Sequence, residues 1–199
     1  MRVIAIAMKD EAATLIKSDD KIQFLDNDHL LVITGIGKVN AARALTEAIF
    51  HYDVDEVINI GVAGATTPYQ VNEVYVIDKA YFHDVDATEF GYEKFQVPGM
   101  PASYQSDTDL MKHVQAKLQL KKADLYTGDE FVTKHKGFTG LIDMEGTALY
   151  QVCHTYEIPI ISIKIISDII EHETDLYNEY NMNEAANTIK TIINTLRGV

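Results

Sequence analysis

Cysteine is scarce in this sequence, and basic residues are few beside acidic ones. Cys153 is the only cysteine among 199 residues, so an internal disulfide framework is excluded and a reducing compartment is indicated. Lysine and arginine number 17 against 30 aspartates and glutamates, which gives a formal net charge of −13. A chain this acidic is repelled by nucleic acid and by anionic membrane surfaces, and we expect neither as a partner.

Long apolar runs are also missing. No stretch approaches the ~20 residues that cross a bilayer, and the short apolar start at 3–8 runs straight into Lys9, Asp10 and Glu11. That pattern is unlike an export signal, so the cytoplasm is the expected location. Internal repeats, low-complexity tracts and Pro/Gly/Ser linkers are absent too, which predicts one domain over residues 1–199.

β-branched runs alternate with helical periodicities along the chain. Five short runs are typical of strands buried on both faces: residues 3–7, 30–33, 56–60, 73–77 and 158–166. Apolar residues spaced three or four apart predict helices over 39–49, 110–118, 149–156 and 189–196. This alternation predicts an α/β sandwich with a largely parallel sheet, whose ligands gather beyond the carboxyl ends of the strands.

Carboxylates and glycines concentrate at those predicted strand ends. Polar or glycine-rich segments occupy residues 8–11, 34–38, 59–64 and 164–168, and the pair Asp143 and Glu145 opens the third predicted helix. Several carboxylates that converge where a ligand binds are expected of acid–base chemistry. Taken singly, each acid is more often a helix cap than a catalyst, and Asp143 in particular fits that plainer interpretation.

Other motifs point away from a nucleotide cofactor or a metal. The turn Gly35-Ile36-Gly37 fails the dinucleotide fingerprint because Asn40 stands where the third glycine belongs. The acidic histidine segments at 83–86 and 171–173 lack the spacing of a zinc or dimetal site, which favours solvated or ligand-contacting loops. Cys153 lies on an apolar helical stripe and is expected to be a buried, inert thiol.

Six aromatic residues cluster between Tyr81 and Tyr104. Gly91, Pro98, Gly99 and Pro101 interrupt the later half of this segment, which indicates an ordered loop rather than a helix. A loop with this much aromatic surface covers a core or lines an interface, and it would favour self-association if exposed.

Taken together and in order, these motifs resemble the bacterial 5′-methylthioadenosine/S-adenosylhomocysteine nucleosidases, within the nucleoside phosphorylase fold superfamily. The resemblance implies a three-layer α/β sandwich with a mixed, largely parallel central sheet. It also implies a homodimer that acts on a small purine nucleoside thioether in methionine salvage. The matching segments are AMKDE (7–11), GIGKVNAA (35–42), NIGVAG (59–64), HDVDATEFGY with QVPGMP (83–101), TGDEF (127–131), DMEGTA (143–148) and KIISD (164–168).

The resemblance also implies roles for individual residues. Glu11 aligns with the general base that activates water, Asp168 with the acid that protonates the purine, and Glu145 with the carboxylate that holds the ribose hydroxyls. The substrate-binding set comprises Met8, Ile36, Phe131 (stacked on adenine), Val132 (reading its edge), Met144 (flanking the sugar) and Tyr177, with Phe90, Tyr92 and Pro98 reaching over from a partner subunit.

The chemistry of a glycosidic bond is consistent with these roles. Its cleavage builds oxocarbenium-like charge on the sugar and negative charge on the leaving base. One carboxyl must therefore be protonated while another is ionised, and we expect Asp168 to have the raised pKa and Glu145 to be ionised near the ribose. No metal or organic cofactor is required. Because Glu11 would repel a phosphate dianion, water is the expected nucleophile.

Several departures from the family pattern leave alternatives open. The stretches between Glu11 and Leu30 and between Val132 and Asp143 are shorter than in typical members, and the second borders the predicted base pocket. Val62 stands where a serine usually helps to orient the catalytic aspartate, and Lys164 replaces an arginine. Gly146 replaces an alanine, and Asn72-Glu73 replaces a Gly-Asp pair. The alternatives are a hydrolase or phosphorylase of another purine nucleoside, or a nucleoside-binding protein with little turnover.

Overall fold

The computed structural model describes residues 1–134, 136–170 and 180–198. Within these ranges nine strands form one mixed sheet: β1 (Arg2–Ile6), β2 (Ile22–Phe24), β3 (His29–Ile33), β4 (Glu56–Ala65), β5 (Val74–Phe82), β6 (Tyr104–Gln105), β7 (Lys121–Thr127), β8 (Leu141–Asp143) and β9 (Ile160–Ile169). The helices are α1 (Lys38–His51), the short 3₁₀ helix η1 (Thr88–Phe90), α2 (Thr108–Leu118), α3 (Gly146–Tyr156) and α5 (Met182–Arg197).

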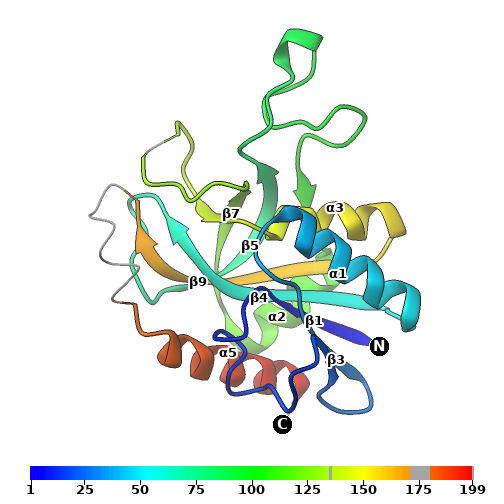
Figure 1. The fold of residues 1–199 in the computed structure, drawn as a ribbon. Coiled ribbons are helices and arrows are strands. Elements are labelled where there is room, and N and C mark those ends of the chain that lie inside the picture. The colour runs from blue at the N-terminus through cyan, green and yellow to red at the C-terminus, as the bar shows by residue number, and fades with distance from the viewer. Residues whose placement is uncertain (135, 171–179, 199) are drawn as a thin grey trace.

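Helices cover both faces of the sheet, so the three-layer α/β prediction is confirmed (Figure 1). One apolar core joins the sheet to α1 and α3 through residues such as Leu45 and Leu149. A second core joins the opposite face to α2 and α5 through residues such as Val114 and Ile193. Within the described residues, every helix is too short or too polar to traverse a membrane.

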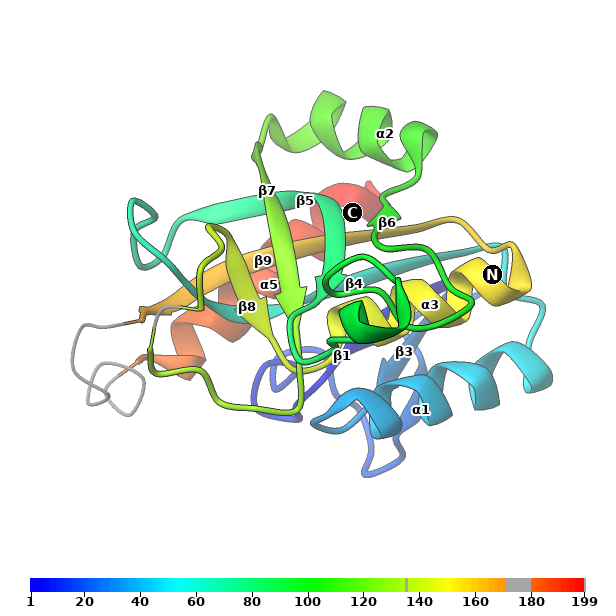
Figure 2. The ribbon, with the colours of Figure 1, turned by 90° about the horizontal axis from the view of Figure 1, so that it is seen from above.

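The sheet mixes parallel and antiparallel pairs, as expected. Its order is β2-β3-β1-β4-β8-β7-β5-β6, and β9 pairs with both β4 and β5. β1 runs parallel to β3 and β4, and β4 runs parallel to β9. The two longest strands, β4 and β9, therefore cross the molecule side by side (Figure 2). Their carboxyl ends meet at the same edge as that of β1.

The predicted strands and helices are all present, and the patterns that produced them have clear physical causes. β1 and β3 are apolar and buried on both faces because helices cover the sheet on each side. The Asp107 carboxylate caps α2 by accepting from the N–H groups of Asp109 and Leu110. Four strands were missed, namely β2, β6, β7 and β8, because three of them have only two or three residues and β7 begins with two exposed lysines.

A long loop, residues 83–103, stands out from the body of the molecule above α3 (Figure 1). It contains η1 and several turns, in agreement with the prediction of an ordered loop. Phe95 anchors its base by edge-on packing against Tyr126 and Phe138, which are themselves stacked at 4.0 Å. We call this segment the projecting loop.

Candidate active site

A pocket opens at the edge where the carboxyl ends of β1, β4 and β9 meet. The three predicted catalytic carboxylates, Glu11, Glu145 and Asp168, all lie in its wall. They come from three distant parts of the chain, which the strand pairing brings to one place. The lining consists of Ala7, Met8, Glu11, Ile36, Val62, Ala63, Gly64, Glu130, Phe131, Val132, Ile142, Asp143, Met144, Glu145, Ser167, Asp168 and Ile170.

Glu11 is 1% exposed, and two backbone amides hold its side chain. The Val62 N–H donates to Oε1 at 2.7 Å, and the Met8 N–H donates to Oε2 at 2.9 Å. Burial raises the pKa of Glu11, while the Val62 N–H, Lys164 and the Met8 N–H act to lower it. Both carboxylate oxygens are therefore bonded by donors that favour the ionised form.

Gly61 makes room for that carboxylate. A Cβ at position 61 would lie 2.6 Å from Oε1 of Glu11, closer than a Cβ atom approaches a neighbour in folded proteins. Any side chain at this position would displace Glu11 from the Val62 amide. The first glycine of the NIGVAG segment is thus required by the close approach of Glu11 to β4.

Glu145 connects the pocket to the start of α1. Its Oε1 accepts from the Gly37 N–H at 2.8 Å, so the carboxylate lies at the positive end of a helix. Burial and the neighbouring Asp143 raise the pKa of Glu145 to about 7. Burial and Asp143 thus act against the ionised form that we expected for Glu145 near the ribose.

Asp143 does more than cap a helix. Its Oδ2 accepts from the Gly146 N–H at 2.9 Å, which is the expected capping role, and the same oxygen lies 2.9 Å from Nζ of Lys164. Both side chains of this ion pair are almost fully buried, at 2% and 3% exposure. Thr127 donates to the other oxygen at 2.6 Å. Lys164 is therefore the cation that compensates a group of buried acids.

Asp168 lies in a different environment from Glu11. Oγ of Ser167 donates to Oδ1 of Asp168 at 2.6 Å, and Gly64 packs close to the other oxygen. Burial raises the pKa of Asp168, as predicted, with the Ser167 hydrogen bond acting against it. Glu11 has two backbone donors and a nearby lysine, whereas Asp168 is held by a hydroxyl. Burial raises the pKa of both acids, but Glu11 has more donors that act to lower it than Asp168 has.

Ser167 supplies a hydroxyl group that bonds Asp168, which Val62 cannot do. The valine side chain lines the pocket without donating, and its backbone amide serves Glu11 instead. The hydroxyl that orients Asp168 comes from the preceding residue on β9. Our sequence reasoning did not assign Ser167 a role, although its place beside the aspartate in KIISD was a usable signal.

Most of the predicted substrate-binding residues lie at the pocket. Met8, Ile36, Phe131, Val132 and Met144 are in its wall. Tyr177 and the segment 171–173 lie outside the described residues. The three residues expected to come from a partner subunit, Phe90, Tyr92 and Pro98, are not in the lining and belong to the projecting loop.

The fold and the site together define an α/β protein of three layers with an acid-lined pocket at the carboxyl ends of its strands. The family model described as the phosphorylase superfamily matches residues 2–196. A curated relative, the 5′-methylthioadenosine/S-adenosylhomocysteine nucleosidase of Bacillus thuringiensis (strain Al Hakam), is 35% identical over 182 residues, which cover 83% of this chain and 79% of the relative. The chain therefore belongs to the phosphorylase superfamily and, within it, to the family of these nucleosidases.

Solved structures agree with that assignment. The nucleosidase of Colwellia psychrerythraea in complex with adenine has a TM-score of 0.86 at 30% identity, and the match covers 98% of this chain and 93% of that one. The Neisseria meningitidis nucleosidase in complex with methylthio-immucillin-A has a TM-score of 0.86 at 27% identity, covering 100% and 99%. The similarity extends over nearly the full length of each chain.

Proposed function

We propose that this chain hydrolyses the N-glycosidic bond of 5′-methylthioadenosine, of S-adenosylhomocysteine, or of both, and releases adenine. The observation that carries the proposal is the convergence of Glu11, Glu145 and Asp168 on one pocket in a member of this nucleosidase family. The adenine and the methylthio-substituted inhibitor bound by its structural relatives support the same substrate class.

Each carboxylate has a role that its surroundings support. Glu11, held by two amides, takes a proton from the attacking water. Protonated Asp168 donates to the departing purine, since its environment favours the neutral form. Glu145 binds the ribose hydroxyls. Positive charge that develops on the sugar favours the ionised form of Glu145, which then stabilises the transition state.

Apolar surfaces beside the acids suit the rest of a purine nucleoside. Phe131 stacks on the adenine ring, and the Val132 backbone reads the edge of the base. Met8, Ile36 and Met144 surround the sugar and its 5′ substituent. Base recognition by stacking and a few backbone contacts is typical of small-molecule pockets.

Hydrolysis is favoured over phosphorolysis by the charge of the pocket. Among the described residues that line it, five are acids and none is lysine or arginine. The nearby Lys164 is already paired with Asp143 at 2.9 Å. A phosphate dianion would meet repulsion here, whereas neutral water would not.

A homodimer is part of the proposal. Phe90 is 82% exposed at the tip of the projecting loop, and Val39 on α1 is 77% exposed. Between them lies an apolar groove formed by α1, α3 and the base of the loop. A second copy would cover this surface and bring Phe90, Tyr92 and Pro98 towards the 5′ end of a neighbouring pocket.

The cytoplasm, where methionine salvage takes place, is the proposed location.

The test is adenine release from each nucleoside in phosphate-free buffer, separated by liquid chromatography and compared with adenosine and inosine. The proposal expects turnover of at least one thioether nucleoside without phosphate. Adenine that forms only after phosphate is added would identify a phosphorylase. Binding without product over hours would identify a nucleoside-binding protein.

A further inference from the structure

One charged cluster beside the pocket takes no part in the chemistry described above. Asp84, which follows β5, lies where three segments of the chain meet: the start of α1, the end of β5 and the segment after β7. Its Oδ2 accepts from Nζ of Lys38 at 2.6 Å and from the N–H of Asp129 at 2.9 Å. We call Asp84, Lys38 and Asp129 the Asp84 clip.

A third contact closes the clip. The Lys38 N–H, at the first position of α1, donates to Oδ1 of Asp129 at 2.8 Å. Asp129 and Glu145 therefore bind consecutive amides of one helix start, because the preceding Gly37 N–H donates to Glu145. The helix has no side-chain cap of its own, and these two carboxylates replace one.

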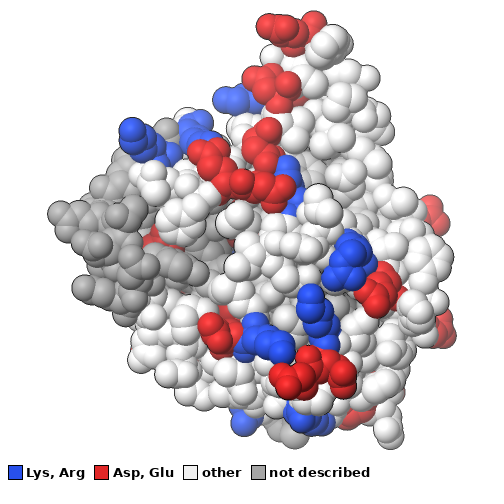
Figure 3. All heavy atoms as spheres, viewed as in Figure 1, with Lys and Arg blue, Asp and Glu red and all other residues white. Residues whose placement is uncertain are grey.

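Steric fit supports the same arrangement. A Cβ on Gly128 would lie 2.6 Å from Nε2 of His83 and 3.0 Å from the Asp84 carboxyl carbon, so the segment after β7 can approach only because it carries glycine there. Burial acts to raise the pKa of Asp84, but the hydrogen bonds from Lys38 and Asp129 outweigh it and hold that pKa below its ordinary range. Red and blue spheres lie side by side beneath the projecting loop in Figure 3, as expected for paired charges at this edge.

The residues next to the clip form two walls of the pocket. Asp129 is followed directly by Glu130, Phe131 and Val132, which line the base side. Lys38 lies two residues after Ile36, which lines the sugar side. The clip thus joins the segment proposed to hold the purine to the turn that contacts Glu145.

We propose that Asp84 is a positioning residue for nucleoside binding, which keeps the purine-stacking segment 130–132 in register with the 35–37 turn and Glu145. This inference rests on the proposed function. Asp84 and Lys38 lie outside the pocket lining, and their side chains bond to each other and to Asp129 rather than to the catalytic acids. Their loss is therefore expected to weaken binding much more than the chemical step.

The principal variant is Asp84→Asn, which removes the charge and preserves the shape. We expect KM for the thioether nucleoside, and Kd for adenine measured by calorimetry, to rise about tenfold, with kcat reduced less than threefold. The matched control is Asp78→Asn, within β5 itself. Asp78 has a comparable ion pair, 2.9 Å from Lys122 and 31% exposed, but lies away from the pocket. The Asp78→Asn variant should have the wild-type KM and Kd, even if its unfolding free energy is lower.

A double-mutant cycle tests whether the clip acts as one unit. Lys38→Met keeps an unbranched side chain and removes both the ion pair and the charge that lies 5.3 Å from the centre of the Phe82 ring. If Lys38 acts through Asp84, the double variant Lys38→Met/Asp84→Asn should bind adenine no more weakly than Asp84→Asn alone. Effects that multiply, or an Asp84→Asn variant with wild-type KM and Kd, would overturn the inference. Should Asp84→Asn fail to fold, the Kd of Lys38→Met alone decides.

Adenine binding separates this inference from the proposed function. If the wild-type chain binds adenine but releases none from any nucleoside, the hydrolase proposal fails while the clip is still tested by Kd. If turnover is normal and Asp84→Asn binds adenine like the wild type, the clip fails alone. A wild-type chain that neither binds adenine nor releases it from any nucleoside would overturn both.

Discussion

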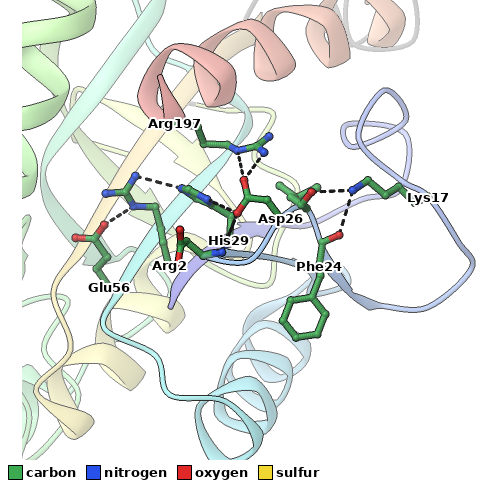
Figure 4. Close-up of polar contacts among 9 residues, drawn as sticks. Arg2, Lys17, Phe24, Asp26, His29, Glu56 and Arg197 are labelled. Atoms are coloured by element: carbon green, nitrogen blue, oxygen red, sulfur yellow. Dashed lines mark hydrogen bonds and ion pairs between the residues drawn. The ribbon is translucent and has the colours of Figure 1, made fainter. Parts of the chain in front are cut away.

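Two charged clusters lie at opposite ends of the sheet and differ in how their acids are compensated. At the carboxyl ends of the strands, Glu11, Asp143 and Glu145 share one cation, Lys164. At the amino ends, two acids face two arginines and a histidine (Figure 4). The members of this amino-end cluster are Arg2, Asp26, His29, Glu56 and Arg197.

The protonation behaviour of the acids follows from that difference. In the amino-end cluster Asp26 is partly exposed, and burial is outweighed by hydrogen bonds from His29, Asp28 and Arg197, which hold its pKa below the ordinary range. In the pocket, burial dominates and raises the pKa of Glu11, Glu145 and Asp168. Balanced ion pairs stabilise a fold, whereas buried acids in excess of their cations are held at a cost in stability and are typical of functional sites.

The largest effect is expected from Asp168→Asn. An amide cannot give up the proton that the departing purine needs, so kcat should fall by about 10²–10⁴-fold. Folding stability at neutral pH should be unchanged or higher, because a desolvated carboxyl is removed. Steady-state kinetics combined with urea unfolding would check both. A variant with nearly normal kcat would show that Asp168 is not the acid.

The control for that experiment is Ser167→Ala. It removes the hydroxyl that orients Asp168 but leaves the acid itself. A smaller loss of kcat than for Asp168→Asn is expected, about tenfold, which corresponds to the net value of one ordinary hydrogen bond. Equal losses for the two variants would instead indicate that the local structure of β9 had been disturbed.

Glu145→Gln sharpens the comparison through the pH dependence of stability. The pKa of Glu145 is raised from 4.5 to about 7, so the folded state holds a proton between these values that the unfolded state has lost. The contribution of Glu145 to the free energy of unfolding therefore falls as the pH rises from 4.5 to about 7. Glutamine has no charge to bury and can still accept from the Gly37 N–H.

The variant should consequently be more stable than the wild type at pH 8, by on the order of 2 kcal/mol, and the difference should vanish near pH 4. Urea unfolding at the two pH values measures it. Activity should fall at both, because the ribose loses its carboxylate. A destabilised variant at pH 8 would show that the charge of Glu145 is compensated in the folded state.

The sequence was informative where side-chain pattern determines the structure. Buried runs in β1 and β3 and the apolar stripes of the helices follow directly from burial on both faces of the sheet. The convergence of three carboxylates on one pocket followed from the rule for parallel strand ends together with the family resemblance. The second half of β4 and the last three residues of β9 were not predicted, since glycine and polar residues there disguise strands that are held by pairing.

What the sequence could not predict depends on contacts between distant segments. Gly61 is needed because Glu11 approaches β4, and Asp84 matters because the segments after β5 and β7 meet the start of α1. The pattern of the acidic histidine segment at 83–86 predicts a solvated or ligand-contacting loop. In the structure Asp84 of this segment is instead bonded to Lys38 and to the Asp129 N–H. The spacing of residues along the chain does not predict such contacts between distant segments.

The smallest effect is expected from Asp26→Asn, in the balanced cluster. Asp26 joins the turn before β3 to the end of α5 through Arg197, and it also bonds the His29 ring at 2.8 Å. Because its pKa is lowered, the stability it contributes is present above the unfolded value near 4 and is lost as pH falls through the folded value. Partly exposed ion pairs of this kind contribute about 1 kcal/mol.

Asp26→Asn should therefore be less stable than the wild type by about 1 kcal/mol at pH 7, the opposite sign to Glu145→Gln, and the gap should narrow on acidification. Its kcat should be that of the wild type, since the cluster lies at the far end of the strands from the pocket. Asp109→Asn, which breaks a fully solvated pair with Lys112, is the matched control and should change neither quantity. If Asp26→Asn proved stabilising instead, compensation by the arginines would not distinguish the two ends of the sheet, and the raised pKa values in the pocket would need another cause than uncompensated burial.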